Sequence, residues 1–396
     1  MLDIQVKGDG RRARSGRLRV GAVTLGIFTV MTAELLPVGL LTPVAADLGV
    51  SAGTAGLMVT VPGLVAAASA PLIAQRAAGA DRRTVLVLLM ALVAVASLGT
   101  ALAGHIAPVL VARALLGVAI GGFWALAGAL APRLVPAAGV GRATAVIFGG
   151  VSAASVLGVP AATAVAEGTG WRGAFAGVGV VALAATGALA TLLPALPGSR
   201  RARAPRLWDL PRRHARVRLG LLLTLLLVTG HFLAYSFVRP VLVEHAHVPE
   251  RFVGPLLLGY GAAGVAGNFL TGPRAARSPL RTLAALGAGL TLALLTLALV
   301  GGTPPAGAAL LILWGLAYGG VSVGLQSWFM AVAAPEDVEN ATGLYVSVFC
   351  LSLALGALLG GLITDATTYT AVLSTGAALT LAACLTAVLS GRKHTP

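Results

Sequence analysis

The chain has 396 residues, of which 57% are hydrophobic and only 10% are Asp, Glu, Lys or Arg. A soluble protein usually carries about 25% charged residues, so this composition excludes a soluble enzyme. The net charge of +15 would suit a protein that binds nucleic acid, but the cations fall in short clusters between apolar runs. This distribution is typical of a membrane protein, and we expect no nucleic-acid partner.

Twelve apolar runs follow a basic arm at 1–19, and each is long enough to cross a bilayer, which takes about 20 residues. A cleaved signal peptide is the alternative for the first run, but that run is too long, contains Glu34 and begins an even series. The predicted spans are Val20–Leu41, Ala55–Ala74, Thr84–Gly104, Pro108–Ala131, Thr144–Val165, Ala174–Leu196, Leu219–Val243, Phe252–Gly272, Thr282–Val300, Ala308–Val332, Ala341–Ile363 and Ala371–Leu389.

Lysine and arginine predict the orientation of these spans, because they are enriched in cytoplasmic loops. All but four of the 28 such residues lie on one side of the membrane together with the N-terminus. The exceptions are Arg172 and Arg251 in outer loops and Arg113 and Arg239 within spans. We therefore expect a multi-pass protein of the inner (plasma) membrane with both termini in the cytoplasm.

The longest polar stretch, a basic linker at 198–218, separates two groups of six spans, which predicts halves at 20–197 and 219–390 and a tail at 391–396. Short matches recur between these halves at a single offset of 198 residues. An even number of crossings separates the halves, so they are parallel repeats, and such an arrangement supports alternating access by rocking about a central site. The matches are Leu116–Gly122 with Trp314–Gly320, Arg83–Thr84 with Arg281–Thr282, Ala143–Thr144 with Ala341–Thr342, and Leu157–Gly158 with Leu355–Gly356.

Several segments also carry a resemblance to a known family of transporters. They are Thr32–Pro43, Asp81–Arg83, Arg113, Gly121–Trp124, Arg133–Pro136, Ile147–Gly149, Gly170–Arg172 and Tyr235–Pro240. On these segments the chain resembles the major facilitator superfamily, and within it the drug/proton antiporter-like exporters and their purine ribonucleoside efflux branch. The resemblance implies an all-α membrane protein of twelve transmembrane helices in two parallel-repeat six-helix halves.

The chain departs from that family in the loop between the second and third spans. Ala74 and Ala78 stand where the family usually has Gly and Asp, and Asp81 occupies a usual Gly position. The departures put the family's carboxylate-based inner latch in doubt. Arg82 and Arg83 remain, either as gating residues or only as determinants of topology.

The fifth span resembles the antiporter signature of the family. Gly158 and Pro160 keep its Gly-x-Pro pattern, which implies a role in gating or packing, whereas Ala161 and Ala162 replace its paired glycines. Ser155 in the same span is a candidate for the substrate cavity.

Glu34 is the only acidic residue within a predicted span, and charged residues inside membranes usually face a cavity or a partner. Arg113 lies at a similar depth, so the two could interact and couple transport to proton movement, or they could form a structural bridge. Gly117 and Gly121 follow Arg113 at four-residue steps and give a smooth face for close helix packing.

His231, Tyr235 and Arg239 follow one another at four-residue steps in the seventh span, which predicts one polar stripe lining the cavity. His231 is either a second titrating group for proton coupling or a histidine bonded to a neighbouring helix. Arg239 is close enough to the span end to reach lipid headgroups, and Pro240 is expected to mark a helix end or kink.

Trp124, Tyr260, Asn268 and Tyr318 complete the predicted substrate cavity together with Tyr235. Their rings and amide could stack on and hydrogen-bond a flat, purine-like ligand. Aromatic residues near span ends also form ordinary interfacial belts.

A proton-coupled exporter of small molecules is the function that these features predict, with purine nucleosides or analogues as the resembled substrates. Relatives that export sugars or antibiotics such as chloramphenicol are the alternative, a uniporter or importer is the nearest rival, and an integral membrane enzyme is the rival from another class. No phosphate-binding loop occurs, and the six histidines form no intramembrane cluster. We expect no cofactor, no metal and a monomer in the lipid bilayer.

Overall fold

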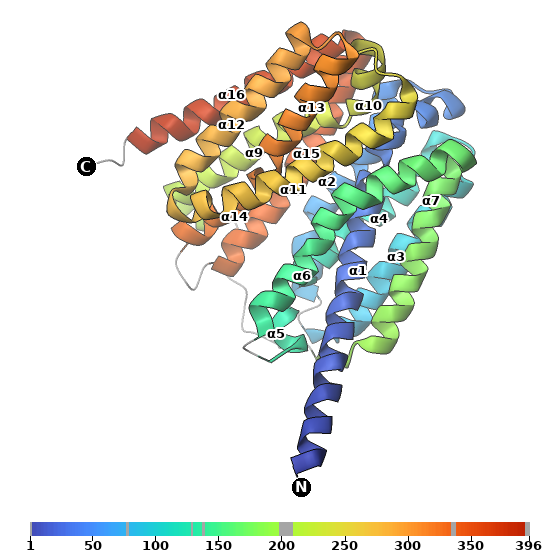
Figure 1. The fold of residues 1–396 in the computed structure, drawn as a ribbon, viewed down its shortest axis with the longest axis vertical. Helices are drawn as coiled ribbons and strands as arrows, with labels where there is room; N and C mark the ends of the chain where they lie inside the picture. Colours follow the sequence, from blue (N-terminus) through green and yellow to red (C-terminus); the bar gives the residue numbers. More distant parts are fainter. Residues whose placement is uncertain are drawn as a thin grey trace.

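The structure is a computed structural model that describes residues 2–76, 79–127, 130–136, 139–197, 209–333 and 338–392. These residues are almost entirely helical and include no β-strand (Figure 1). The linker and the tail expected from the sequence lie partly outside these ranges.

The first half of the chain forms helices that alternate in direction. They are α1 (Leu2–Leu48), α2 (Ala52–Arg76), α3 (Arg82–Leu102), α4 (Ile106–Ala127), the short α5 (Ala131–Leu134), α6 (Val140–Ala153), the π-helix η3 (Ala154–Gly158) and α7 (Val159–Leu192). Pro160 has no N–H for the carbonyl of Val156, and the N–H of Val159 instead bonds the carbonyl of Ala154, five residues back. The missing donor therefore accounts for the π-helical turn.

The second half repeats this pattern with more interruptions. Its elements are α8 (Asp209–Arg213), α9 (Ala215–Tyr235), α10 (Val238–Pro240), η4 (Val241–His245), η5 (Glu250–Phe252), α11 (Val253–Arg277), α12 (Pro279–Val300), α13 (Pro304–Gly319), α14 (Val321–Val332), α15 (Val338–Ala366) and α16 (Tyr369–Arg392).

Eleven helical segments of the described chain are long and apolar enough to cross a membrane. One of them, Gly149–Leu192, has 44 residues, about twice what one crossing needs. The chain turns back within it at Gly170, whose φ of 74° is open mainly to glycine. The segment thus makes two crossings and completes the expected twelve, although the loop expected before Ala174 is reduced to this single interruption.

Two spans that hydropathy predicts as unbroken, Leu219–Val243 and Ala308–Val332, are broken in the structure. α9 ends at Tyr235 because Pro240 offers no N–H to the carbonyl of Ser236. α13 ends at Gly319, and a side chain at Gly320 would overlap the hydroxyl of Thr271. Apolar side chains continue across both breaks, so the hydropathy pattern does not register them.

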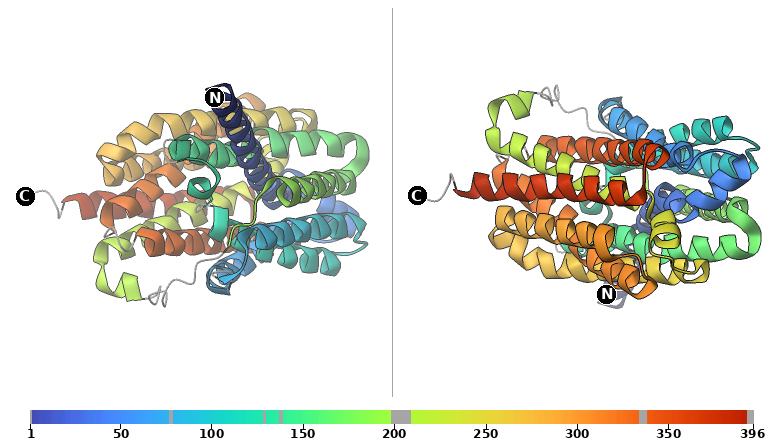
Figure 2. Two further views of the ribbon diagram at one scale, coloured as in Figure 1. Left: turned by 90° about the horizontal axis from the view of Figure 1, so that it is seen from below. Right: turned by 90° about the horizontal axis from the view of Figure 1, so that it is seen from above.

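Buried side chains form two main clusters, one drawn mainly from 20–196 and the other mainly from 210–387. The two groups of helices lie side by side (Figure 2). Glycines of α4 lie directly against α2, and the equivalent glycines of α13 lie against α11 with partners that are again 198 residues further along. The pairs are Gly117 with Pro62, Gly121 with Ala66, Gly315 with Tyr260, and Gly319 with Gly264.

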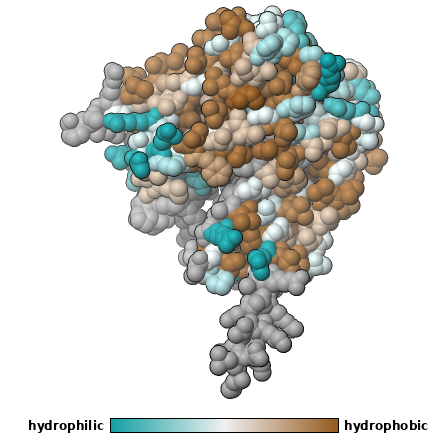
Figure 3. All heavy atoms as spheres, in the orientation of Figure 1, coloured by the Kyte–Doolittle hydropathy of each residue, from teal (hydrophilic) through white to brown (hydrophobic). Residues whose placement is uncertain are grey.

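Apolar side chains cover much of the molecular surface, and hydrophilic residues gather near the margins of the face shown in Figure 3. Leu88, Leu102, Phe269 and Leu299 are among the large apolar residues that are exposed. Such a surface is stable only in a hydrocarbon environment, and the chain is a multi-pass membrane protein.

The two halves meet through α2 and α15. At the end of α15, the carboxylate of Asp365 accepts hydrogen bonds from the Ser51 hydroxyl (2.6 Å) and from the backbone N–H of Gly53 in α2 (2.9 Å). At the same end, Arg239 donates to the carbonyl of Gly39 in α1 (3.2 Å). Polar contacts between the halves therefore close this end of the molecule.

Candidate functional site

Arg113 is the most extensively bonded side chain at the centre of the first half. It is 2% exposed, and it donates to the carbonyls of Met58 (2.7 Å), Ala33 (2.8 Å) and Glu34 (3.0 Å). One guanidinium on α4 thereby joins α1 and α2.

Two prolines explain why the carbonyls of Ala33 and Met58 need a side-chain donor. Pro37 lies four residues after Ala33, and Pro62 lies four residues after Met58, so neither carbonyl receives the usual helical N–H. A buried carbonyl without a donor is costly, and Arg113 supplies the missing hydrogen bonds. The spacing of the two prolines was a signal in the sequence that could have identified these partners.

Glu34 is 4% exposed, and its carboxylate oxygen Oε2 has no hydrogen-bond partner. Arg113 bonds its backbone carbonyl, and the two side chains form no ion pair in the described structure, although they interact electrostatically. The carboxylate also interacts electrostatically with Tyr318 and Cys350 of the other half. Glu34 therefore lies between the halves, in a setting where binding a proton would remove the cost of burying a charge.

Four rings form what we call the aromatic stack: Tyr318, His231, Tyr235 and Tyr260. Ring centroids are 3.3 Å apart from Tyr318 to His231, 4.9 Å from His231 to Tyr235, and 4.8 Å from Tyr235 to Tyr260, with interplanar angles of 8°, 21° and 25°. The stack brings together α9, α11 and α13.

Trp314 lies edge-on to this stack, with its ring centroid 5.6 to 6.0 Å from those of His231, Tyr235 and Tyr260. Its indole N–H donates to Nδ1 of His231 at 3.0 Å. An indole nitrogen can only donate, so Nδ1 is the acceptor and the imidazole carries its proton on Nε2. That Nε2 and the hydroxyl of Tyr260 are buried without hydrogen-bond partners, which leaves two polar groups available to a ligand.

The structure does not bring all of the predicted cavity residues together. Asn268 is half-buried two turns beyond Tyr260 in α11, and Trp124 packs against the core of the first half. The side chain of Ser155 lies outside the described part of the structure. Arg239 is not on the predicted stripe, because α9 ends at Tyr235, and its guanidinium binds Gly39 and Glu250 in place of lipid headgroups.

The predicted gating and packing residues lie around the first half. Arg83 donates to the carbonyl of Ala190 in α7, and the Asp81 carboxylate accepts from the N–H of Leu196 (2.7 Å). The backbone N–H of Arg82 bonds the carbonyl of Leu196 (2.9 Å). These contacts join the start of α3 to the end of α7 within one half.

Gly158 lies against the side chain of Thr32, two residues before Glu34. Pro160 follows it in the first turn of α7. The π-helical turn η3 therefore lies against α1 near the carboxylate, and π-helical turns are often found at functional sites.

Comparison with known proteins identifies one family and relatives that align over most of the chain. A family model described as the Major Facilitator Superfamily matches residues 23–357 and 220–396. The chain is 37% identical to a protein named transcription regulatory protein OpdE of Pseudomonas aeruginosa over 95% of this chain and 94% of that protein. It is 33% identical to the purine ribonucleoside efflux pump NepI of Salmonella paratyphi C, over 89% of this chain and 88% of that protein.

Solved structures share the fold at low sequence identity. A mutant of the nucleoside transporter NupG aligns with a TM-score of 0.77 and 13% identity over 94% of this chain and 99% of that one. A bacterial homologue of the human lysosomal transporter Spinster, in an inward-facing and occupied conformation, aligns with a TM-score of 0.71 and 14% identity over 94% of each chain. At these identities the likeness shows the fold alone.

Proposed function

This chain belongs to the major facilitator superfamily and is a multi-pass transporter of small molecules, and we propose that it exports purine nucleosides or their analogues by proton antiport. The proposal places it in the inner membrane with both termini in the cytoplasm, so that the end closed by Asp365 faces outward.

The aromatic stack is the observation that carries the substrate class. Within the stack, His231 and Tyr235 are covered on both faces, whereas the end rings of Tyr318 and Tyr260 each stack on one neighbour only. A nucleobase could stack on the outer face of an end ring, and such stacking on an aromatic side chain is worth about 1–3 kcal/mol. The N–H at Nε2 of His231 can donate to a ring nitrogen or oxo group of a purine, and the Tyr260 hydroxyl can donate or accept. The Salmonella relative is named a purine ribonucleoside efflux pump, which supports the same class.

Glu34 is the group we propose to carry the proton. Its carboxylate interacts electrostatically with Tyr318 at one end of the stack, so binding of a proton would alter the electrostatic environment of the proposed substrate site. Arg113 would keep α1, α2 and α4 together while the halves rock. In this proposal His231 serves the substrate, because its Nδ1 lone pair is engaged by Trp314.

Transport in inside-out membrane vesicles tests the proposal. With an acidic lumen, vesicles containing the protein should accumulate a radiolabelled purine nucleoside, and a protonophore should abolish the accumulation. Tyr260→Ala should raise the concentration for half-maximal uptake at least about fivefold, whereas Tyr369→Phe, at the start of α16, should not change it.

A panel of a pyrimidine nucleoside, a sugar and chloramphenicol separates the alternatives. Accumulation of chloramphenicol or sugar without nucleoside would replace the proposed substrate class. Nucleoside flux that never exceeds equilibration under the imposed gradient would make the protein a uniporter.

A further inference from the structure

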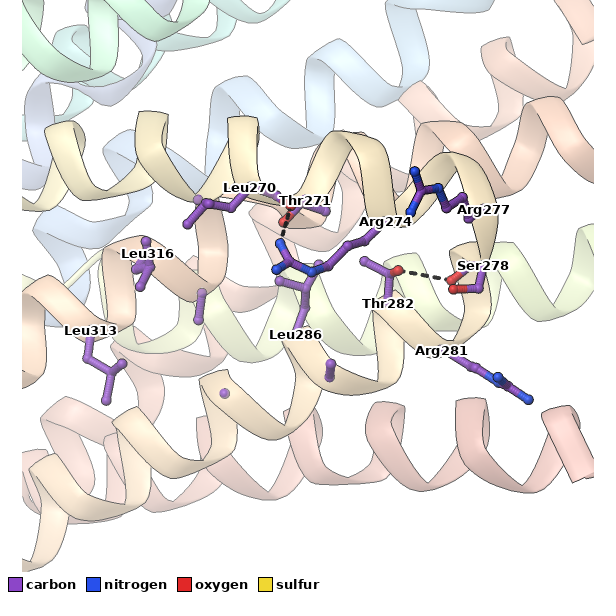
Figure 4. A pocket seen from close by; sticks show the side chains of 14 residues that line it. Leu270, Thr271, Arg274, Arg277, Ser278, Arg281, Thr282, Leu286, Leu313 and Leu316 are labelled. Atoms are coloured by element: carbon purple, nitrogen blue, oxygen red, sulfur yellow. Dashed lines mark hydrogen bonds between the residues drawn. The ribbon is translucent and has the colours of Figure 1, made fainter.

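A groove with a volume of about 540 Å³ lies among α11, α12 and α13 (Figure 4). No residue of the aromatic stack lines it, and α12 and α13 pack against other helices of the second half. Leu270 and Leu313 on its walls are exposed, so the groove opens toward the bilayer. Its walls are mainly apolar, with Leu286 and Leu316 as further members.

Three arginines lie at one end of the groove. Arg274 and Arg277 belong to the last turn of α11, and Arg281 belongs to the first turn of α12. All three are exposed, no acidic residue lines the groove, and none of the three forms an ion pair within the described ranges. The site therefore joins a positive mouth to an apolar channel.

The equivalent loop of the first half uses its charges differently. Arg83 corresponds to Arg281 at the offset of 198 and donates to the carbonyl of Ala190. Asp81 corresponds to Pro279, and its carboxylate joins this loop to Leu196. In the second half the proline removes the carboxylate. Arg274 donates to the carbonyl of Leu270 in its own helix (2.6 Å, Figure 4), and none of the three arginines has an acidic partner within the described ranges.

We propose that this groove binds one anionic phospholipid, with its phosphate among the three arginines and an acyl chain along the apolar walls. Charge and shape both fit this occupant: basic residues near a membrane surface attract anionic lipid, and guanidinium groups bind phosphate oxygens in a forked geometry. The lipid belongs to the cytoplasmic leaflet, an assignment that rests on the proposed orientation.

Native mass spectrometry of the purified full-length protein tests the site. The protein is titrated with phosphatidylglycerol or with phosphatidylcholine of the same chain length, and lipid-bound peaks are counted. A surface arginine strengthens such binding by about fivefold. Phosphatidylglycerol should therefore bind at least fivefold more tightly than phosphatidylcholine, and the triple variant Arg274→Gln, Arg277→Gln, Arg281→Gln should lose this preference.

Matched variants distinguish a specific lipid site in the groove from a general electrostatic attraction of anionic lipid to the basic surface. Arg76→Gln, Arg142→Gln and Arg213→Gln together remove the same charge outside the groove and should keep the preference. Ala285→Phe fills the groove without changing charge and should weaken phosphatidylglycerol binding, and inorganic phosphate in excess should fail to displace the lipid. Replacing the three groove arginines by lysine should retain selectivity for the anionic lipid.

Equal loss of preference in the two triple glutamine variants would overturn the proposal. So would full binding to Ala285→Phe, or displacement of the lipid by inorganic phosphate alone. Nucleoside transport is not part of these measurements, so they stand or fall separately from the proposed substrate.

Discussion

Glu34 and Arg113 lie on neighbouring helices and are both buried, yet their side chains are bonded very differently. Each nitrogen of the guanidinium donates to a backbone carbonyl, whereas the carboxylate retains an oxygen without a partner. An oxygen without a hydrogen-bond partner can take up a proton without breaking the helix packing around it. This contrast supports our proposal that Glu34 carries the proton, while Arg113 holds the helices together.

Glu34→Gln should keep the fold, because the amide is similar in size. With no proton to carry, it should reduce proton-driven nucleoside accumulation in inside-out vesicles at least about tenfold, while nucleoside exchange without a gradient continues. Asp47→Asn is the control, since Asp47 is paired with Arg172 at the end of α1 and should retain driven uptake. Accumulation by Glu34→Gln at the wild-type rate would assign coupling to another residue.

Trp314→Phe should weaken nucleoside binding about five- to tenfold, because phenylalanine keeps the edge-on contact but cannot donate to His231. One hydrogen bond contributes about 1 kcal/mol, and its loss also frees the imidazole to place its proton on either nitrogen. Equilibrium binding of a radiolabelled nucleoside to purified protein measures the effect. Trp328→Phe, whose indole bonds the carbonyl of Arg216, should leave binding unchanged.

At the scale of single helices, hydropathy predicts some features of the structure and misses others. It predicts the positions of the spans, because each needs an apolar run of known length, but it does not predict the breaks after Tyr235 and Gly319. The span positions predict that Glu34 and Arg113 lie at a similar depth in the membrane. They do not predict that Arg113 binds backbone carbonyls and forms no ion pair with Glu34. The partners of Arg113 depend on Pro37 and Pro62, each of which leaves the carbonyl four residues before it without a helical N–H. The informative sequence pattern was therefore the position of these prolines and not the spacing of the charged residues.

The proline explanation makes a prediction about stability. Arg113→Ala should lower the melting temperature of the purified protein, because buried carbonyls left without donors cost about 1–3 kcal/mol each. Arg113→Lys should lower it less. Adding Pro62→Ala to Arg113→Ala should recover part of the loss, since an alanine at position 62 would offer an N–H to the carbonyl of Met58.

Pro71→Ala provides the comparison, because Pro71 lies in the same helix but its missing N–H concerns Ala67. It should give no recovery in the Arg113→Ala background. Equal recovery from both proline replacements would show that Arg113 does not act through the Met58 carbonyl.

At the scale of the whole molecule, the sequence predicted the repeat at 198 residues and a close-packing face at Gly117 and Gly121. It predicted neither the partner helices nor the different roles of the two halves. Phe232 stands in the second half where Glu34 stands in the first, and Leu311 stands where Arg113 stands. The first half therefore holds the buried charges, while the second contributes the aromatic stack. One architecture was duplicated and the two copies now have different side-chain chemistry.

Opening of the closed end requires the contacts of Asp365 with Ser51 and Gly53 to break. Asp365→Ala should therefore raise the population that is open at that end. Cys350 is buried between the halves, so its alkylation from outside by a membrane-impermeant maleimide reports this opening in a Cys384→Ser background. We expect alkylation several-fold faster than in the parent, and Thr367→Ala, just beyond the end of α15, should have no effect. An unchanged rate in Asp365→Ala would show that these contacts do not hold the end closed.

The edge-on placement of Trp314 has an optical consequence. The ring centroids of Tyr235 and Tyr260 lie 5.9 and 6.0 Å from that of Trp314. Light absorbed by these tyrosines should therefore be transferred to the indole, and the emission of Trp314 should report on the stack. A nucleobase stacked on the end of this group would change both the energy transfer and the polarity around the indole. With the other four tryptophans of the chain replaced by phenylalanine, Trp314 would be the single tryptophan, at the proposed substrate site. Its fluorescence would then report substrate binding in real time without an added label.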